Sequence, residues 1–213
     1  MADIFIEGPA GRIEAKFMQG HNEKSPIVLI LHPDPRQEGT MHNKVVYTLY
    51  KAFSESGFQT LRINFRGVGF SQGSSTEGDG EIEDAMTALY WIKRNCPLAS
   101  QIWLSGFSFG AWVSLKLLME NPTCSGFIAI SPPASRFNFD FLSPCPVSGL
   151  IIQGTNDDIV PCESVTQCFQ NLKSQPKSYV KYEVIENANH FFVGYLDILS
   201  IKIKKYINTM LET

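Results

Sequence analysis

The chain has 213 residues, which suits one domain with a sizeable core, and we expect a single domain over residues 1–213. A net charge of −3 gives no basic excess, so the composition does not favour a nucleic-acid partner. The longest aliphatic run, "IVLIL" at 27–31, is too short to cross a bilayer, so we expect no membrane span.

The first hundred residues alternate between strand-like and helix-like segments. The expected strands are 3–7, 12–17 (after the turn "GPAG"), 26–31 and 58–65. Apolar residues at helical spacing predict a helix over 41–56, and Gly57 is well placed to end it. The same spacing over 82–92 predicts a second helix, with Pro97 just beyond its end.

The alternation continues through the second half of the chain. The expected strands are 101–107, 126–131, 147–154 and 181–186, and the expected helices are 111–119, 161–172 and the segment after Tyr195. Strands that alternate with helices, and whose apolar runs are continuous, predict an α/β fold: a mostly parallel, twisted sheet with helices on both faces. In such sheets, function gathers at the carboxyl ends of the strands.

The segment "GFSFG" at 106–110 places Ser108 between a strand and a helix, which is the context in which G-x-S-x-G forms a nucleophile elbow. A sharp turn forces the serine towards sparsely populated backbone angles. The strand and the helix then nearly touch, so the residues two positions before and two after the serine must be small. Gly106 and Gly110 meet this requirement. The turn also points the backbone N–H of Phe109 towards negative charge that forms beside Ser108. A tight turn that happens to contain serine is the alternative.

A serine nucleophile needs a base, which is usually a histidine oriented by a carboxylate. The chain supplies both after Ser108. The strand 147–154 leads into "TNDDIVP", which offers Asp157 and Asp158, and the strand 181–186 leads into the loop that holds His190. All three loops follow strand ends, so these side chains are expected to converge at one edge of the sheet.

The segments "LHPDP", "INFRGVGFSQG", "GFSFGAW", "GTNDDIVP" and "NANHFF" closely resemble those of α/β hydrolases. In particular, they are similar to the small bacterial serine hydrolases grouped with dienelactone-hydrolase-like proteins. True dienelactone hydrolases use a cysteine nucleophile, whereas this elbow carries Ser108, so their substrate is not implied here.

The resemblance selects Asp157 over Asp158, because the family's acid stands three residues after the glycine and four before the proline. It also implies that "HPDP" is the oxyanion loop. Because prolines have no N–H, the donor that joins Phe109 would be the backbone of Asp34. His32 is expected to organise this loop. Arg66, in the "RGVGFS" segment, is expected to pair with an acidic neighbour.

Two further groups of residues have local interpretations. Asp79 or Glu81 is expected to cap the start of the helix that follows, rather than to bind a metal. The alternating Phe137, Phe139 and Phe141 either line an acyl pocket or pack a short loop, and the sequence leaves both open.

We therefore predict a serine hydrolase that cleaves small ester-type acyl substrates through Ser108, His190 and Asp157, with no metal or organic cofactor. About fifteen residues, 132–146, occupy the place where a lid would be inserted, too few for a lid domain. An acyl thioesterase is the alternative enzyme, and a non-catalytic scaffold is the alternative class of protein.

The chain has five cysteines without a C-x-x-C pair, and no signal-peptide pattern. These features predict free thiols and a cytoplasmic location. Whether the chain forms a homo-oligomer is left open by the sequence.

Overall fold

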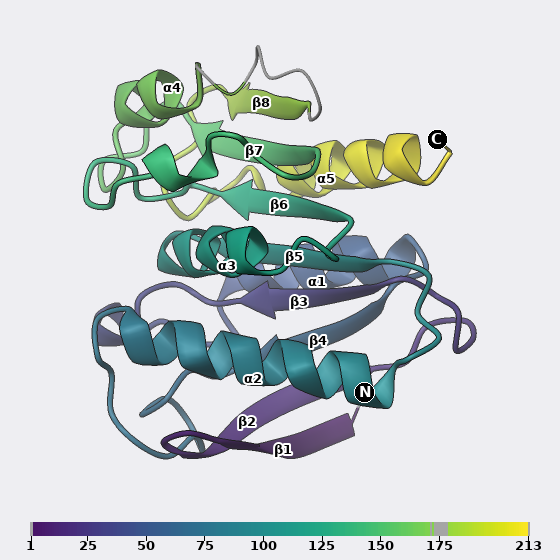
Figure 1. Cartoon of the computed structure of the whole chain (residues 1–213). Coiled ribbons are helices and arrows are strands. Elements are labelled where there is room, and N and C mark those ends of the chain that lie inside the picture. Colours follow the sequence, from purple (N-terminus) through teal and green to yellow (C-terminus); the bar gives the residue numbers. More distant parts are fainter. Residues whose placement is uncertain (1, 171, 173–178, 213) are drawn as a thin grey trace.

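The computed structural model describes residues 2–170, 172 and 179–212. Its strands form one sheet, in the order β1-β2-β4-β3-β5-β6-β7-β8 (Figure 1). They are β1 (Ala2–Gly8), β2 (Gly11–Met18), β3 (Ile27–Leu31), β4 (Gln59–Ile63), β5 (Ile102–Phe107), β6 (Gly126–Ile130), β7 (Gly149–Gly154) and β8 (Val180–Ile185). The ladders β1–β2 and β2–β4 are antiparallel and the other five are parallel, so the mostly parallel sheet is confirmed.

The helices alternate with the strands as the sequence predicts. They are α1 (Lys44–Glu55), α2 (Asp79–Asn95), α3 (Phe109–Glu120), α4 (Cys162–Gln170) and α5 (Leu196–Leu211), with short 3₁₀ turns η1 (Pro35–Gln37) and η2 (Asp140–Leu142). Helix α1 starts three residues later than expected, because Asn43 caps it by accepting the Val45 N–H. Position 171 of the expected helix 161–172 lies outside the described residues.

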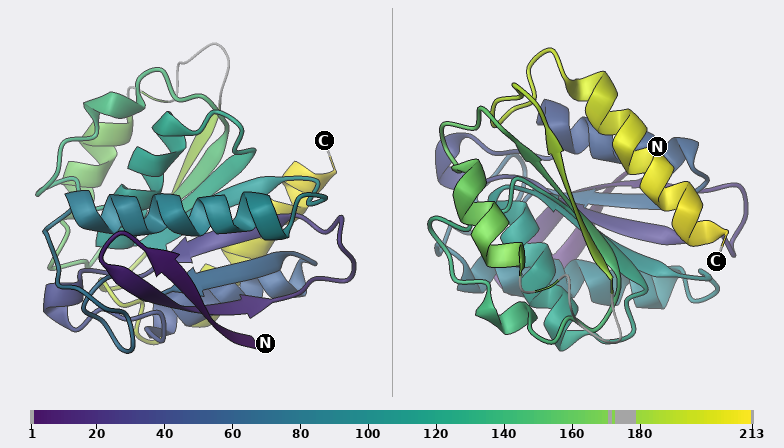
Figure 2. Two further views of the ribbon diagram at one scale, coloured as in Figure 1. Left: turned by 60° about the horizontal axis from the view of Figure 1, so that its bottom comes forward. Right: turned by 90° about the horizontal axis from the view of Figure 1, so that it is seen from above.

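The helices cover both faces of the sheet, as expected. Helices α1 and α5 lie on one face and α2, α3 and α4 on the other (Figure 2). Strand β3 serves both layers, because alternate side chains point to opposite faces. Its Leu29 and Leu31 pack with the α2–α3 layer, while Val28 and Ile30 pack with the α1–α5 layer.

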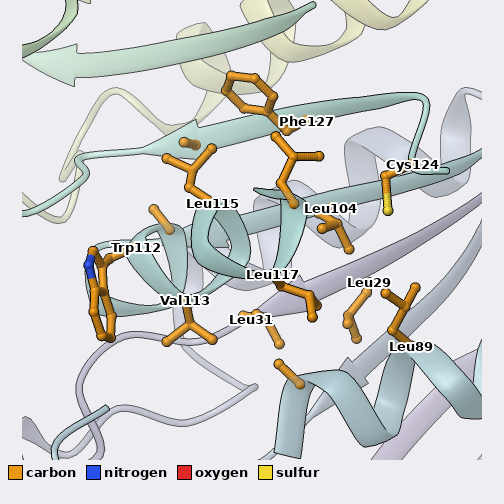
Figure 3. Packing of buried hydrophobic residues seen from close by; sticks show 14 of the residues in the cluster. Leu29, Leu31, Leu89, Leu104, Trp112, Val113, Leu115, Leu117, Cys124 and Phe127 are labelled. Atoms are coloured by element: carbon orange, nitrogen blue, oxygen red, sulfur yellow. The ribbon is translucent and has the colours of Figure 1, made fainter. Parts of the chain in front are cut away.

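Helix α3 is apolar on almost every side and is buried against the sheet. Figure 3 shows its Leu115 and Leu117 among Leu104 and Phe127 of the strands and Leu89 of α2. Burial on all sides holds the start of α3 firmly against the end of β5, and Ser108 lies at this junction.

The segment that joins β6 to β7 is short and contains only η2 as regular structure. The expected absence of a large lid domain is confirmed. Among the described residues, no helix is long and apolar enough to cross a membrane.

Candidate active site

The elbow at Ser108 has the strained geometry that its sequence predicts. Ser108 connects β5 directly to α3 with φ 53° and ψ −119°, a region that non-glycine residues rarely adopt. A Cβ at Gly106 would lie 2.2 Å from the Gly110 carbonyl oxygen, and one at Gly110 would lie 2.4 Å from the Leu31 carbonyl oxygen. Both glycines are therefore required by close backbone approach. The Ser108 N–H donates to the Ile130 carbonyl (2.8 Å), which ties the elbow to β6.

Asp157 and His190 form a buried pair in the loops that follow β7 and β8. The His190 Nδ1–H donates to Asp157 Oδ2 at 2.7 Å, with side-chain exposures of 4% and 0% respectively. The other carboxylate oxygen accepts the backbone N–H groups of Ile159 (3.0 Å) and Val160 (2.7 Å). Asp158, in contrast, is exposed. The structure thus pairs His190 with Asp157, as the resemblance implies.

This pairing controls the charge of the carboxyl and the tautomer of the ring. Burial raises the pKa of Asp157, but the hydrogen bond and charge of His190, together with the hydrogen bonds from Val160 and Gln153, outweigh it and hold that pKa below its usual range. Because Nδ1 of His190 carries the shared proton, Nε2 is the ring nitrogen left to accept another. Such an arrangement suits a general base.

Ser108 and His190 line the same cavity, which has a volume of about 380 Å³. Apolar walls come from Phe109, Phe137, Ile159, Val160 and Phe191, and polar groups come from Asp34, Gln37, Glu38, Asn43, Ser135 and Arg136. In the described part of the chain, no hydrogen bond joins the Ser108 hydroxyl to the His190 ring. Catalytic hydrogen bonds are often long in unliganded enzymes and shorten when substrate binds.

Asp34 lines the cavity and caps η1. Its carboxylate accepts hydrogen bonds from the Arg36 backbone N–H (2.9 Å) and guanidinium (2.9 and 3.1 Å), and from Arg136 Nη1 (3.1 Å). Burial raises the pKa of Asp34, but the hydrogen bonds from Arg36 and the charges of Arg36 and Arg136 together outweigh that effect and keep the pKa below its usual range. These contacts fix the side chain of Asp34 at the start of η1, in a segment that lines the same cavity as Ser108. Phe109 begins α3, where the first N–H groups have no partner within the helix.

His32 lies beneath this loop and organises it, as expected. Its Nδ1–H donates to the Pro33 carbonyl (2.6 Å), and its Nε2 accepts the Phe65 N–H (3.0 Å). Burial lowers the pKa of His32 to about 4, so the ring is neutral at pH 7. A neutral ring with both nitrogens engaged links the end of β3 to the segment after β4.

The other residues discussed in the sequence analysis make local contacts in the structure. Arg66 forms a buried ion pair with Asp84 (2.8 Å), and Glu81 accepts the Gly78 N–H (2.9 Å) at the start of α2. Phe137 lines the cavity, whereas Phe139 stacks on Phe141 outside it. Phe137 therefore lines a cavity and the other two rings pack the short loop, while the acyl pocket itself stays a prediction.

Two residues of this site are not singled out by the sequence. Gln153 is fully buried and donates to Asp157, and Arg136 reaches Asp34 from 102 positions further along the chain. For Gln153, the available signal is an amide that ends the aliphatic run "GLII". Within the ranges described, no cluster of three or more His, Cys, Asp or Glu is arranged to hold a metal ion, and all five cysteines are free thiols.

Comparisons with known proteins agree with this fold. The alpha/beta hydrolase fold family matches residues 26–148. An uncharacterised protein of Rickettsia prowazekii, RP471, is 44% identical over 99% of this chain and 90% of its own length. The lysophosphatidylserine lipase ABHD12 of Gallus gallus is 24% identical over 87% of this chain, which spans 57% of that protein.

Solved structures are similar over nearly the whole chain. The protein of unknown function ATU1826 from Agrobacterium tumefaciens is 40% identical with a TM-score of 0.96, covering 99% of this chain and 97% of its own. XC6422 from Xanthomonas campestris, described as an α/β serine hydrolase without a lid, is 32% identical with a TM-score of 0.87, covering 98% and 94%. The chain belongs to the α/β-hydrolase family, and hydrolysis is the class of reaction that this membership supports.

Proposed function

We propose that the protein is a serine esterase that acts on small acyl substrates. The observation that carries this proposal is the buried Asp157–His190 hydrogen bond of 2.7 Å, whose histidine shares a cavity with the strained Ser108. Ser108 is the nucleophile, His190 the general base and Asp157 the group that orients it. The backbone N–H groups of Asp34 and Phe109 form the oxyanion hole.

The reaction has two steps. His190 Nε2 takes the hydroxyl proton as Ser108 attacks the ester carbonyl, and the oxyanion hole holds the negative charge that develops on the carbonyl oxygen. His190 then gives its proton to the leaving alcohol, and an acyl-enzyme remains. Water, activated by the same ring, attacks the acyl-enzyme and releases the acid. This chain's residues supply every proton transfer.

The proposal is tested by activity on short p-nitrophenyl esters together with labelling by a fluorophosphonate probe. We expect Ser108→Ala to lose the label and about 10⁶ in kcat. Ser135→Ala is the matched control for labelling, because Ser135 lines the same cavity without lying on an elbow. Turnover that persists unchanged in Ser108→Ala would refute the assignment.

The cavity without a lid suits small or flexible acyl groups, and we propose an ester ahead of a thioester as the substrate. Esters, thioesters and amides with one common acyl group rank the three activities by kcat/KM. A thioester preference would replace the esterase by a thioesterase that uses the same residues. Absence of probe labelling in the wild-type protein would favour a non-catalytic scaffold. Fractionation of cells tests the predicted cytoplasmic location.

A further inference from the structure

Gln153, the penultimate residue of β7, makes direct contact with the acid of the proposed triad. Its side chain is 0% exposed. The amide nitrogen Nε2 donates to Asp157 Oδ2 at 2.9 Å and to the Val160 carbonyl at 2.8 Å. Oδ2 is the same oxygen that accepts from His190 Nδ1. One carboxylate oxygen is therefore shared between the base and a buried amide.

The orientation of this amide follows from its neighbours. A carboxylate and a carbonyl accept hydrogen bonds and cannot donate them, so the NH₂ end of Gln153 must face Asp157 and Val160. Its Oε1 is then buried, and none of the described residues donates to it. A leucine or methionine would fill the same space without an unpaired buried oxygen. Such a residue would also leave the Val160 carbonyl without this donor, so the glutamine supports the loop as well as contacting Asp157.

We propose that Gln153 is a positioning residue that fixes the Asp157 carboxylate and limits its attraction for the proton on His190. This inference rests on the proposed function. The amide N–H draws charge from Oδ2, so less negative charge faces the ring. Without this hydrogen bond, Asp157 would bind the protonated ring more tightly and would have one restraint fewer on its rotamer. The ring would then hold its proton to higher pH, and fewer molecules would carry a competent base.

The other charged groups around the ring stay in place when Gln153 is replaced. Asp157 contacts the ring directly, and the charged residues that line the cavity of His190 are Asp34, Glu38 and Arg136. The two rings packed on His190, Phe107 and Phe191, carry no charge. A pH shift in a Gln153 variant therefore reports on the contact with Asp157.

The test is Gln153→Met, which keeps the length of the side chain and removes the donor. Gln59→Met is the matched control, since Gln59 is also buried and its Nε2 donates to the Ser25 carbonyl (2.9 Å) at the other end of the sheet. Both variants lose a buried amide hydrogen bond to a backbone carbonyl, so both are expected to unfold at lower temperature. In Gln153→Met alone, we expect the plateau of kcat/KM to fall about tenfold.

Two titrations separate positioning from a purely structural role. In Gln153→Met, we expect the acid limb of the kcat/KM profile and the NMR titration midpoint of the His190 ring to move up by about half a pH unit. In Gln59→Met, both stay at the wild-type position. The His190 signals are identified by comparison with His190→Gln. Midpoints that stay unchanged in Gln153→Met would overturn the inference, whether or not the rate falls. Because the NMR titration needs no turnover, a wild-type protein without Ser108-dependent activity would refute the esterase and still leave Gln153 tested.

Discussion

Asp157 and His190 are joined by a hydrogen bond of 2.7 Å although 33 positions separate them in the chain. Neighbouring parallel strands bring them together: β7 and β8 pair in register up to Gly154 and Ile185, and each loop starts at that edge. The loop of Asp157 is itself anchored, because its carboxylate accepts the N–H groups of Ile159 and Val160. The orientation of the ring therefore depends on one carboxylate, and Asp158 beside it is exposed.

This arrangement predicts opposite outcomes for two adjacent aspartates. Asp157→Asn keeps the shape of the side chain but no longer favours the His190 tautomer that carries its proton on Nδ1, so we expect kcat to fall about 10⁴-fold. Asp158→Asn is the matched control, and its kcat should stay within about twofold of wild type. Ester hydrolysis at saturating substrate measures both. Comparable losses in the two variants would contradict the assignment of the acid.

Phe137 is predicted to limit the length of the acyl group. Its ring lines the cavity and stacks on Trp112 at 4.3 Å between centroids. Removing the ring in Phe137→Ala enlarges the cavity on this side, so we expect the preferred acyl chain to become longer, with KM for short esters raised. Phe141→Ala is the control, because that ring packs on Phe139 outside the cavity. Rates for p-nitrophenyl esters of increasing chain length give the comparison, and an unchanged profile in Phe137→Ala would count against this wall as the acyl site.

Gly110 is predicted to be intolerant of even a methyl group. A Cβ there would lie 2.4 Å from the Leu31 carbonyl oxygen and 2.5 Å from that of His32, so the end of β3 and the loop after it must move. We expect Gly110→Ala to lower the free energy of unfolding by about 3 kcal/mol and to reduce activity by displacing Asp34. Urea denaturation measures the first effect and ester hydrolysis the second.

Gly194→Ala provides the comparison for Gly110→Ala. Gly194 has φ 79°, and a Cβ there would meet no atom within 4 Å. Only backbone strain opposes the methyl group, so the loss should be about 1 to 2 kcal/mol, and activity should be retained. If Gly110→Ala were as stable and active as wild type, the close approach of α3 to β3 would not constrain the elbow.

The fold follows from the sequence because its signals are local. Continuous apolar runs such as 27–31 predict buried parallel strands, and these lie in the middle of the sheet. The ends of elements are less well predicted. The strand expected over 58–65 spans only Gln59–Ile63. The Asn64 N–H still donates to the Glu14 carbonyl (2.8 Å), while its side chain donates to the Glu14 carboxylate (2.7 Å) and accepts the Met41 N–H (2.8 Å).

The site is predictable only where the sequence carries a motif. The elbow has one, so its strain and close approaches are expected from five residues. The choice between Asp157 and Asp158 cannot be made from residue type, because both are carboxylates in one loop, and only the spacing of the resembled family separates them. Gln153 and Arg136 act through partners that folding brings near. Their roles depend on which face of β7 and which side of the cavity they occupy, and neither is encoded locally.

His32 predicts a pH dependence of stability that is separate from catalysis. Burial lowers its pKa to about 4 in the folded protein, from 6.5 as its ordinary value. Between these pH values the unfolded chain binds a proton at this residue and the folded chain does not, so stability rises with pH. As the pH falls from 6.5 to 4, His32 should therefore remove about 3 kcal/mol from the free energy of unfolding, and below pH 4 it should contribute no further change.

Urea denaturation at several pH values measures this loss, and two glutamine variants isolate its source. His42 is exposed, so His42→Gln should keep the wild-type slope, whereas His32→Gln, which cannot titrate, should have a flatter one. If His32→Gln fails to fold, NMR titration of wild-type protein replaces it, and the His32 ring signals should stay constant from pH 7 down to about 5. A ring that protonates near pH 6.5 in the folded protein would show that the buried position of His32 admits a charge, and the neutral link between Pro33 and Phe65 would then not hold.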